Sequence, residues 1–194
     1  MRFLVKGPPP DGLRAYRADG DNRTLRAALL DAQRGYCAYT EKRVDALDTC
    51  AVEHFDPRKK GDDDWFNWYA TLQSANQRKR RHDRALANAP FFESRFFQKV
   101  EGAARIRYVR GRGLYKAVDP ADVEARELIE YLGLNDPTLH DVRRRHVKRV
   151  RDTLARIAQS EWIEWFREHP EDLSFITAIE VELELPGLLA KAAA

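Results

Sequence analysis

The residues of this sequence that could do chemistry together lie within the range 35–79. Glu53 and His54 are adjacent, Asn67 follows in an aromatic stretch, and Asn76 follows in a segment that begins like a helix. Such a set suits phosphodiester hydrolysis, because water attacks this anionic group only when a cation offsets the developing charge. A hard divalent ion such as Mg²⁺ takes oxygen ligands, which the carboxylate of Glu53 and the amide carbonyl of Asn76 can supply.

The remaining residues have candidate roles in the same reaction. Histidine is the side chain whose ordinary pKa suits proton removal from water near neutral pH, so His54 is the candidate general base. Asn67 is a candidate partner for the second imidazole nitrogen, which must be held if the ring is to present the correct one. Asn76 would lie in the first turn of its helix, where free backbone N–H groups favour a phosphate. The candidate contacts to neighbouring phosphates are basic side chains: Arg58, Arg78, Lys79 and Arg81.

Other interpretations of these residues remain open. Adjacent residues on a regular strand face opposite sides, so Glu53 and His54 need either a bend or a metal and a base on opposite sides of the phosphate. His54 could be a satisfied core histidine. Asn76 could be only a helix-start residue, and Asn67 only a turn former.

The segments that must position these residues contain helices and short strands. Apolar residues recur at helical spacing over 22–33 and predict a helix there. Short apolar and aromatic segments at 37–41 and 51–55 predict strands or turns that flank a loop. A capping-box pattern predicts a further helix over 74–87.

The second half of the chain adds a hairpin and more helices. An alternating pattern over 104–118 predicts a β-hairpin, and helices are predicted over 120–132, after Pro137 and around 162–166. The long helix after Pro137 is expected to have one apolar side, made of Leu139, Val142, His146, Val150, Leu154 and Ile157. Pro186-Gly187 is expected to end the ordered region. The predicted fold class is therefore α+β, and mostly α.

Length and charge set limits on the possible functions. A chain of 194 residues fits a single domain, 1–194, that buries enough surface to fold without disulfides. The net charge is only +3, from 34 basic and 31 acidic residues, but basic residues crowd the stretches around 78–84 and 143–151. Acidic residues crowd 160–184. These clusters predict either a polyanion site or solvated helix faces.

Cysteine content and hydropathy bear on location. Two cysteines, Cys37 and Cys50, favour a reducing cytoplasm over a disulfide scaffold. The N-terminal residues hold no long apolar segment typical of a secretion signal, and no stretch is apolar enough to span a membrane. We therefore expect a cytoplasmic protein without a membrane partner.

The order of these features resembles the HNH (ββα-metal) endonucleases. More specifically, it is similar to the HNH subunit of Septu-type and HNH-bearing retron anti-phage systems. The shared motifs are Leu25-Arg26-Ala27-Ala28-Leu29-Leu30, Gln33-Arg34-Gly35-Tyr36-Cys37-Ala38-Tyr39, Glu53-His54-Phe55-Asp56-Pro57-Arg58, the aromatic-flanked Asn67, Asn76 followed by Lys79, and Leu132-Gly133-Leu134-Asn135 with Leu139 and Arg143. The resemblance covers about residues 25–145, and it rests on the order and spacing of motifs that are individually weak.

This resemblance implies a fold and a set of roles. A small ββα-metal unit over about 35–88 would be embedded among helices, followed by one additional short β-hairpin and a helical region over about 89–185. His54 would be the general base and Asn67 would orient the site. Glu53 and Asn76 would hold Mg²⁺ or Mn²⁺. The substrate would be double-stranded DNA or a structured RNA, and a partner ATPase of the ABC/SMC-like type would regulate the nuclease.

The sequence departs from the family at a structural zinc site. Many relatives carry two Cys-x-x-Cys pairs, whereas the corresponding positions here are Cys37 with Thr40 and Leu72 with Ala75. One thiol cannot make a tetrahedral site, so we expect no structural zinc.

Two other functions fit the same sequence. The chain could be a catalytically weak nucleic-acid-binding subunit whose basic surface positions a partner. It could also be a helical adaptor that recruits proteins through its acidic C-terminal region. The basic helix over 143–151 could accordingly bind DNA phosphates or pair with the acidic region of this chain or of a partner. Trp162, Trp165 and Phe166 could form core or a docking face.

Overall fold

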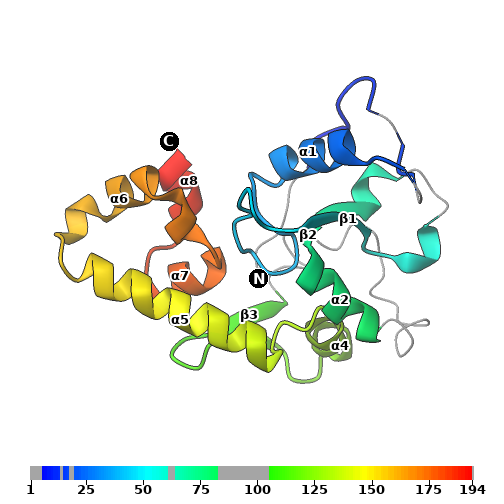
Figure 1. The fold of residues 1–194 in the computed structure, drawn as a ribbon. Coiled ribbons are helices and arrows are strands. Elements are labelled where there is room, and N and C mark those ends of the chain that lie inside the picture. The colour runs from blue at the N-terminus through cyan, green and yellow to red at the C-terminus, as the bar shows by residue number, and fades with distance from the viewer. Residues whose placement is uncertain (1–5, 14, 18–19, 61–63, 83–104, 194) are drawn as a thin grey trace.

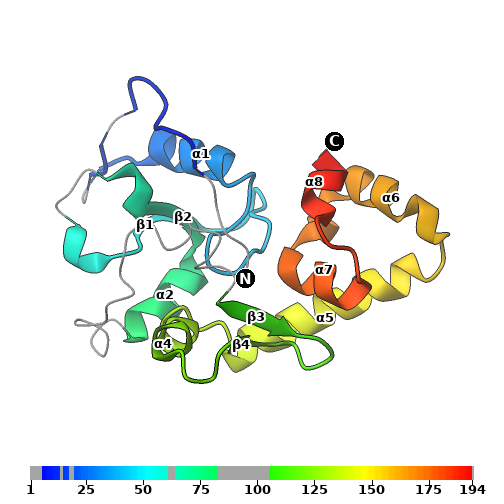
Figure 2. The same ribbon diagram turned by 180° about the vertical axis from the view of Figure 1, so that it is seen from behind.

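The structure is a computed structural model that describes residues 6–13, 15–17, 20–60, 64–82 and 105–193, without the side chains of 80–82 and 193. Its elements form two groups (Figures 1 and 2). The first group holds α1 (Arg23–Ala32), β1 (Cys50–His54), β2 (Trp68–Leu72) and α2 (Gln73–His82). The second holds α6 (Trp162–Glu168), α7 (Ile176–Leu183) and α8 (Leu188–Ala193).

The long helix α5 (Pro137–Leu154) extends from the first group to the second (Figure 1). The hairpin of β3 (Ile106–Val109) and β4 (Leu114–Ala117) packs beside it, and α4 (Val123–Tyr131) lies next to α2 (Figure 2). Short 3₁₀ turns complete the described chain: η1 (Pro57–Lys59), η2 (Trp65–Asn67), η4 (Gln159–Glu161) and η5 (Pro170–Leu173). The predicted α+β, mostly helical fold class is confirmed.

The first group has the order strand, strand, helix. β1 and β2 pair antiparallel with Glu53 opposite Tyr69 and His54 opposite Trp68, and α2 begins directly after β2. Helix α1 covers this hairpin and buries Leu25 and Leu29 against it. The helix predicted over 74–87 begins one residue earlier than expected, at Gln73. The predicted end at 87 and the expected boundary at 88 lie outside the described residues.

Aspartate caps and proline explain where the later helices begin. Asp122 accepts a hydrogen bond from the backbone N–H of Ala125 at 3.0 Å, so α4 begins after Asp122. Asp136 caps α5 in the same way, and Pro137 occupies the first helical position, where its missing N–H costs nothing. The predicted hairpin is confirmed as β3–β4, with the turn at residues 110–113.

The buried side of α5 differs from the predicted one. Val142 is exposed, whereas Arg143 and Val147 are buried. The guanidinium of Arg143 donates to the carbonyl oxygen of Gly113 at 2.6 Å and to that of Leu134 at 3.0 Å. Hydrophobic periodicity could not anticipate this rotation, because a basic side chain enters a core only where carbonyl acceptors from elsewhere in the chain meet it.

The C-terminal end also differs from the sequence prediction. We expected the ordered region to end at Pro186-Gly187, but the chain turns there and forms α8, with Leu188 completely buried. One cluster of buried apolar side chains runs through both groups, from Tyr69 in β2 through Leu132 to Ile179 in α7. Trp162 and Trp165 pack against this cluster, which favours the core interpretation of these aromatic residues.

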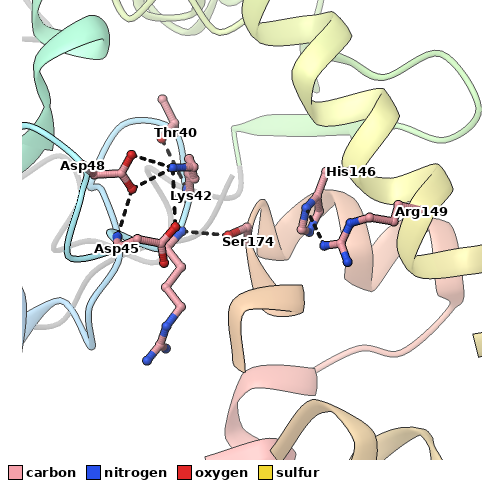
Figure 3. Close-up of polar contacts among 8 residues, drawn as sticks. Thr40, Lys42, Asp45, Asp48, His146, Arg149 and Ser174 are labelled. Atoms are coloured by element: carbon pink, nitrogen blue, oxygen red, sulfur yellow. Dashed lines mark hydrogen bonds and ion pairs between the residues drawn. The ribbon is translucent and has the colours of Figure 1, made fainter. Parts of the chain in front are cut away.

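The loop that precedes β1 docks on the C-terminal helices. The backbone N–H of Arg43 donates to the hydroxyl of Ser174 at 3.0 Å (Figure 3). In the same loop Lys42 donates to both carboxylate oxygens of Asp48, at 2.7 and 2.8 Å, which holds the loop in shape (Figure 3). Within the described part of the chain, no helix is long and apolar enough to cross a membrane.

Candidate functional site

Glu53 and His54 lie on opposite faces of the β1–β2 hairpin. Both residues are in register with β2, so β1 runs without a bend through the pair. The carboxylate of Glu53 contacts Lys79 of α2, while the imidazole of His54 contacts Trp68 and Tyr16. The bend that the first of the two arrangements requires is therefore not present between Glu53 and His54.

Lys79 binds Glu53 in the interior of the protein. Its side chain is completely buried, and its ammonium donates to the Glu53 carboxylate and, at 2.7 Å, to the carbonyl oxygen of His54. The rings of Tyr39 and Tyr131 lie 6.0 and 5.4 Å from the ammonium, within the range of cation–π attraction. Lys79 was expected to contact DNA phosphates, whereas this structure places its charge beside the candidate metal ligand.

Asn76 presents a buried oxygen on the same face of α2. It precedes Lys79 by three residues, so the two side chains share the side of the helix that faces β1. Asn76 is 6% exposed, and its Oδ1 has no hydrogen-bond partner among the described residues. A buried acceptor without a partner costs about 1–3 kcal/mol, and such an atom calls for an explanation such as a bound water or ion.

The donor set fits a hard divalent cation. Glu53 and Asn76 would supply two oxygen ligands, which suits Mg²⁺ because this ion keeps several waters and also takes phosphate oxygens. The described residues contain no group of three or more His, Cys, Asp or Glu side chains that could hold a metal. Two protein oxygens would leave the other coordination positions of Mg²⁺ to waters and phosphate oxygens.

Asn67 holds the backbone that follows His54. Its Oδ1 accepts from the N–H of Asp56 at 2.8 Å, and its Nδ2 donates to the carbonyl oxygen of Asp56 at 3.1 Å. Asn67 is completely buried, so both contacts are protected from water. Asn67 therefore orients the segment after the histidine rather than the imidazole ring for which it was a candidate partner.

Trp68 is the partner of the imidazole. Its indole Nε1–H donates to Nε2 of His54 at 3.0 Å, and because an indole nitrogen is only a donor, Nε2 is the unprotonated nitrogen. The ring of Tyr16 lies edge-on to the imidazole with centroids 4.7 Å apart. His54 is only 3% exposed as a result.

The sequence interpretation missed these two aromatic contacts. Trp68 could have been found from the strand register, since it lies directly opposite His54. Tyr16 is 38 residues away in the sequence and carries no local signal.

The other predicted phosphate contacts are Arg58, Arg78 and Arg81. Arg58 is exposed and forms two hydrogen bonds with the buried carboxylate of Asp56, at 2.9 and 3.0 Å, which raise the pKa of its guanidinium. Arg78 lines a cavity of about 420 Å³ between α2 and the start of α5. The side chain of Arg81 lies outside the described residues.

Cys37 contacts the segment that corresponds to the second cysteine pair of zinc-binding relatives. Its Sγ accepts a hydrogen bond from the backbone N–H of Leu72 at 3.4 Å, and both cysteines are free thiols. Ala75 is buried in the same apolar cluster as Cys37 and Leu72.

We compared the chain with known proteins. No protein-family model matches it, and no curated protein and no solved structure is significantly similar to it.

Proposed function

We propose that this protein is a metal-dependent endonuclease of the HNH type that hydrolyses phosphodiester bonds in double-stranded DNA. The observation that carries the proposal is the buried, unpartnered Oδ1 of Asn76, on the face of α2 that binds Glu53 through Lys79. A buried oxygen without a partner among the described residues, on the side of α2 that contacts Glu53 through Lys79, fits a bound cation better than a purely structural contact does.

Two features of the fold support the same proposal. The order β1, β2, α2 places Glu53 and His54 at the end of the first strand and Asn76 in the first turn of the helix. Cys37 also contacts Leu72, as the resemblance to zinc-binding relatives requires of the two segments that carry their cysteine pairs. The anti-phage role and the ABC/SMC-like ATPase partner belong to the proposal through that resemblance alone. The cytoplasmic location belongs to it through the low cysteine content.

In the proposed reaction each side chain has a separate task. Glu53 and Asn76 would hold Mg²⁺ or Mn²⁺, which when bound offsets charge on the phosphate. His54 would take a proton from the attacking water, for which the indole N–H of Trp68 must leave Nε2. Tyr16 must also move, because it covers the ring. Asn67 would keep the strand end in position.

A second function is favoured by the burial of His54. A histidine that is 3% exposed and accepts a hydrogen bond at Nε2 has the environment of a structural residue. The corresponding function is a nucleic-acid-binding subunit that positions a partner without cleaving.

Cleavage and metal binding by matched variants test the proposal. We expect wild-type protein with Mg²⁺ or Mn²⁺ to nick duplex DNA, and His54→Ala to lower the rate by about 10²–10⁴-fold. His169→Ala, in a half-buried histidine that stacks on Trp165, is the matched control and should keep the wild-type rate. Mn²⁺ binding, followed by calorimetry, should be weakened in Glu53→Gln and Asn76→Ala. If wild type binds DNA but neither cleaves nor binds Mn²⁺, even with the ATPase added, the binding-subunit function replaces this proposal.

A further inference from the structure

The basic residues of α5 divide into two sets. Members of the internal set are buried or pair with a buried carboxylate of this chain, and members of the external set do neither. Arg143 is buried, Arg149 pairs with the buried carboxylate of Asp172 at 2.5 Å, and Arg151 pairs with the buried carboxylate of Glu182 at 2.9 Å. The acidic C-terminal region therefore neutralises part of this helix within the chain, which was one of the two possibilities that the sequence left open.

The external set has no such partners. Arg144 and Arg145 are exposed and form no ion pair with any described residue. Among the described residues, Lys148 pairs only with Asp152, which lies one helical turn further along and is itself exposed. A surface pair of this kind contributes little and is easily exchanged for another anion.

These cations border a preformed groove between α5 and the β3–β4 turn. The groove encloses a cavity of about 710 Å³, and its lining includes Tyr108, Gly111, Arg144, Arg145, Lys148 and Arg151. Along α5, Arg144, Lys148 and Arg151 follow at spacings of four and three residues, so they share one side of the helix over about 10 Å.

Hydrogen bonds from α5 and α7 fix the hairpin wall of the groove. Arg143 holds the carbonyl oxygen of Gly113, and His140 contacts that of Arg112 at 2.9 Å. Glu182 accepts from the backbone N–H of Gly111 at 2.7 Å. The turn lies so close to α5 that a Cβ at Gly113 would lie 2.8 Å from Cγ of Arg144. The groove is therefore present before any ligand binds.

We propose that this groove binds the phosphodiester backbone of duplex DNA, as a second contact region outside the hydrolytic site. This inference rests on the proposed nuclease function, which it deepens by defining how the substrate is held. The ligand chemistry follows from the charges of the groove. Of its acids, Glu182 pairs with Arg151, Asp152 pairs with Lys148, and Asp141 lies exposed beside His140. Arg144 and Arg145 are left without an ion pair among the described residues, and contacts from such cations to phosphates require no particular base sequence.

The position of α5 connects the groove with the hydrolytic site. The cavity that Arg78 lines also contacts Asp136 and Pro137, where α5 begins. From Pro137 to Lys148 the helix rises about 16 Å, which corresponds to roughly five base steps of duplex. Figures 1 and 2 show that α5 runs from the neighbourhood of α2 and α4 toward α6. A duplex that lies along α5 from the cavity at Arg78 would thus reach the groove after about five base steps.

Binding measured without cleavage tests this inference separately from the nuclease proposal. Full-length protein carrying His54→Ala is titrated with a 25-base-pair duplex in EDTA, and fluorescence anisotropy is followed at several salt concentrations. Adding Arg144→Ala and Arg145→Ala should weaken binding at least tenfold at 0.1 M salt. It should also reduce the slope of log K against log salt by about 2, because each lost phosphate contact contributes about 0.9. The matched control is Arg23→Ala with Arg126→Ala, which removes the same charge from exposed positions on α1 and α4 and should change binding less than threefold.

Each outcome separates the two proposals. Equal binding by the two double variants, with both folded by circular dichroism, would overturn the groove and leave the nuclease proposal intact. Arg144- and Arg145-dependent binding in a wild-type protein that never cleaves would support the groove and count against the nuclease. Poly-glutamate is a third titrant: if it binds through Arg144 and Arg145 while the duplex does not, the surface takes an acidic protein and the inference is wrong.

Discussion

Glu53 and Lys79 form an ion pair inside the protein, between the first strand of the hairpin and the helix that follows the second. The carboxylate is 6% exposed and the ammonium is completely buried. The residue proposed to bind the metal is therefore also a residue that holds α2 against β1. The negative charge of Glu53 would therefore serve both the packing of α2 against β1 and the proposed binding of a metal ion.

Removal of Lys79 should destabilise the fold. Lys79→Met leaves the carboxylate of Glu53 buried without its cation, which typically costs about 3–5 kcal/mol of unfolding free energy. The double variant Glu53→Gln with Lys79→Met removes both charges and should recover most of that loss. Urea denaturation of the two variants measures the difference. Equal stability of the two variants would show that the ion pair does not hold the helix.

Asn67→Ala should also destabilise the protein. The change leaves the buried N–H of Asp56 without a partner, while the carbonyl oxygen of Asp56 keeps its hydrogen bond from the backbone N–H of Lys59 at 3.2 Å. It should cost about 1–3 kcal/mol and lower Tm by roughly 2–12 °C. Asn135 makes the same two contacts with the backbone of Tyr115, at 2.8 and 2.9 Å, but it is exposed. Asn135→Ala is therefore the matched control, and a smaller loss is expected because water can replace the amide. A loss as large as that of Asn67→Ala would contradict the role of burial.

Tyr16 should control access to His54. Tyr16→Ala removes the ring that lies edge-on to the imidazole, and it should raise the rate of His54 modification by diethyl pyrocarbonate several-fold. Tyr16→Phe keeps the ring and should react at the wild-type rate. Peptide mass spectrometry measures the modification, with His169 as the internal reference. If both variants react like wild type, Tyr16 does not cover the imidazole in solution.

Lys6 should make stability depend on pH. Burial lowers the pKa of Lys6 to about 7 from its ordinary 10.5, although the charge of Asp64 acts in the opposite direction. Between these values the unfolded chain holds a proton that the folded chain has lost, so the free energy of unfolding rises with pH in this window. Below pH 7 both states are protonated and the contribution is constant.

The measurement compares wild type with Lys6→Met by urea denaturation. From pH 7 to pH 9 the stability of wild type should increase relative to the variant by about 2 kcal/mol. Lys116→Met, in an exposed lysine of β4, should show no such pH dependence. A constant difference between wild type and Lys6→Met at both pH values would contradict the lowered pKa.

Glu41 should anchor the C-terminal helices to the loop before β1. Its carboxylate accepts the backbone N–H and the hydroxyl of Thr177, each at 2.8 Å, and its carbonyl oxygen accepts from Phe175 at 2.7 Å. Glu41→Gln turns one acceptor into a donor that faces Thr177, and it should cost about 1.5–3 kcal/mol. Thr177→Val removes only the hydroxyl and should cost less. Thermal unfolding followed by circular dichroism compares the two variants.

The sequence by itself determined the type and order of many elements, although α7 and α8 were not among those it predicted. Helical periodicity placed α1 within one residue of its observed ends, and alternation around a glycine-rich turn identified β3 and β4. It also singled out four candidate site residues. The structure places Glu53 and His54 on β1, Asn67 at the end of η2 directly before β2, and Asn76 on α2. Such features can be predicted because backbone preference and residue type act over a few neighbouring positions.

Only the tertiary structure decided which partner each side chain has. Lys79 turns inward to Glu53 instead of outward, Asn67 bonds to the backbone of Asp56, and Trp68 takes Nε2 of His54. Arg143 replaces Val142 on the buried side of α5 for the same reason. A buried polar group goes wherever a complementary group from a distant part of the chain can meet it, and that information is absent from any local pattern of residues.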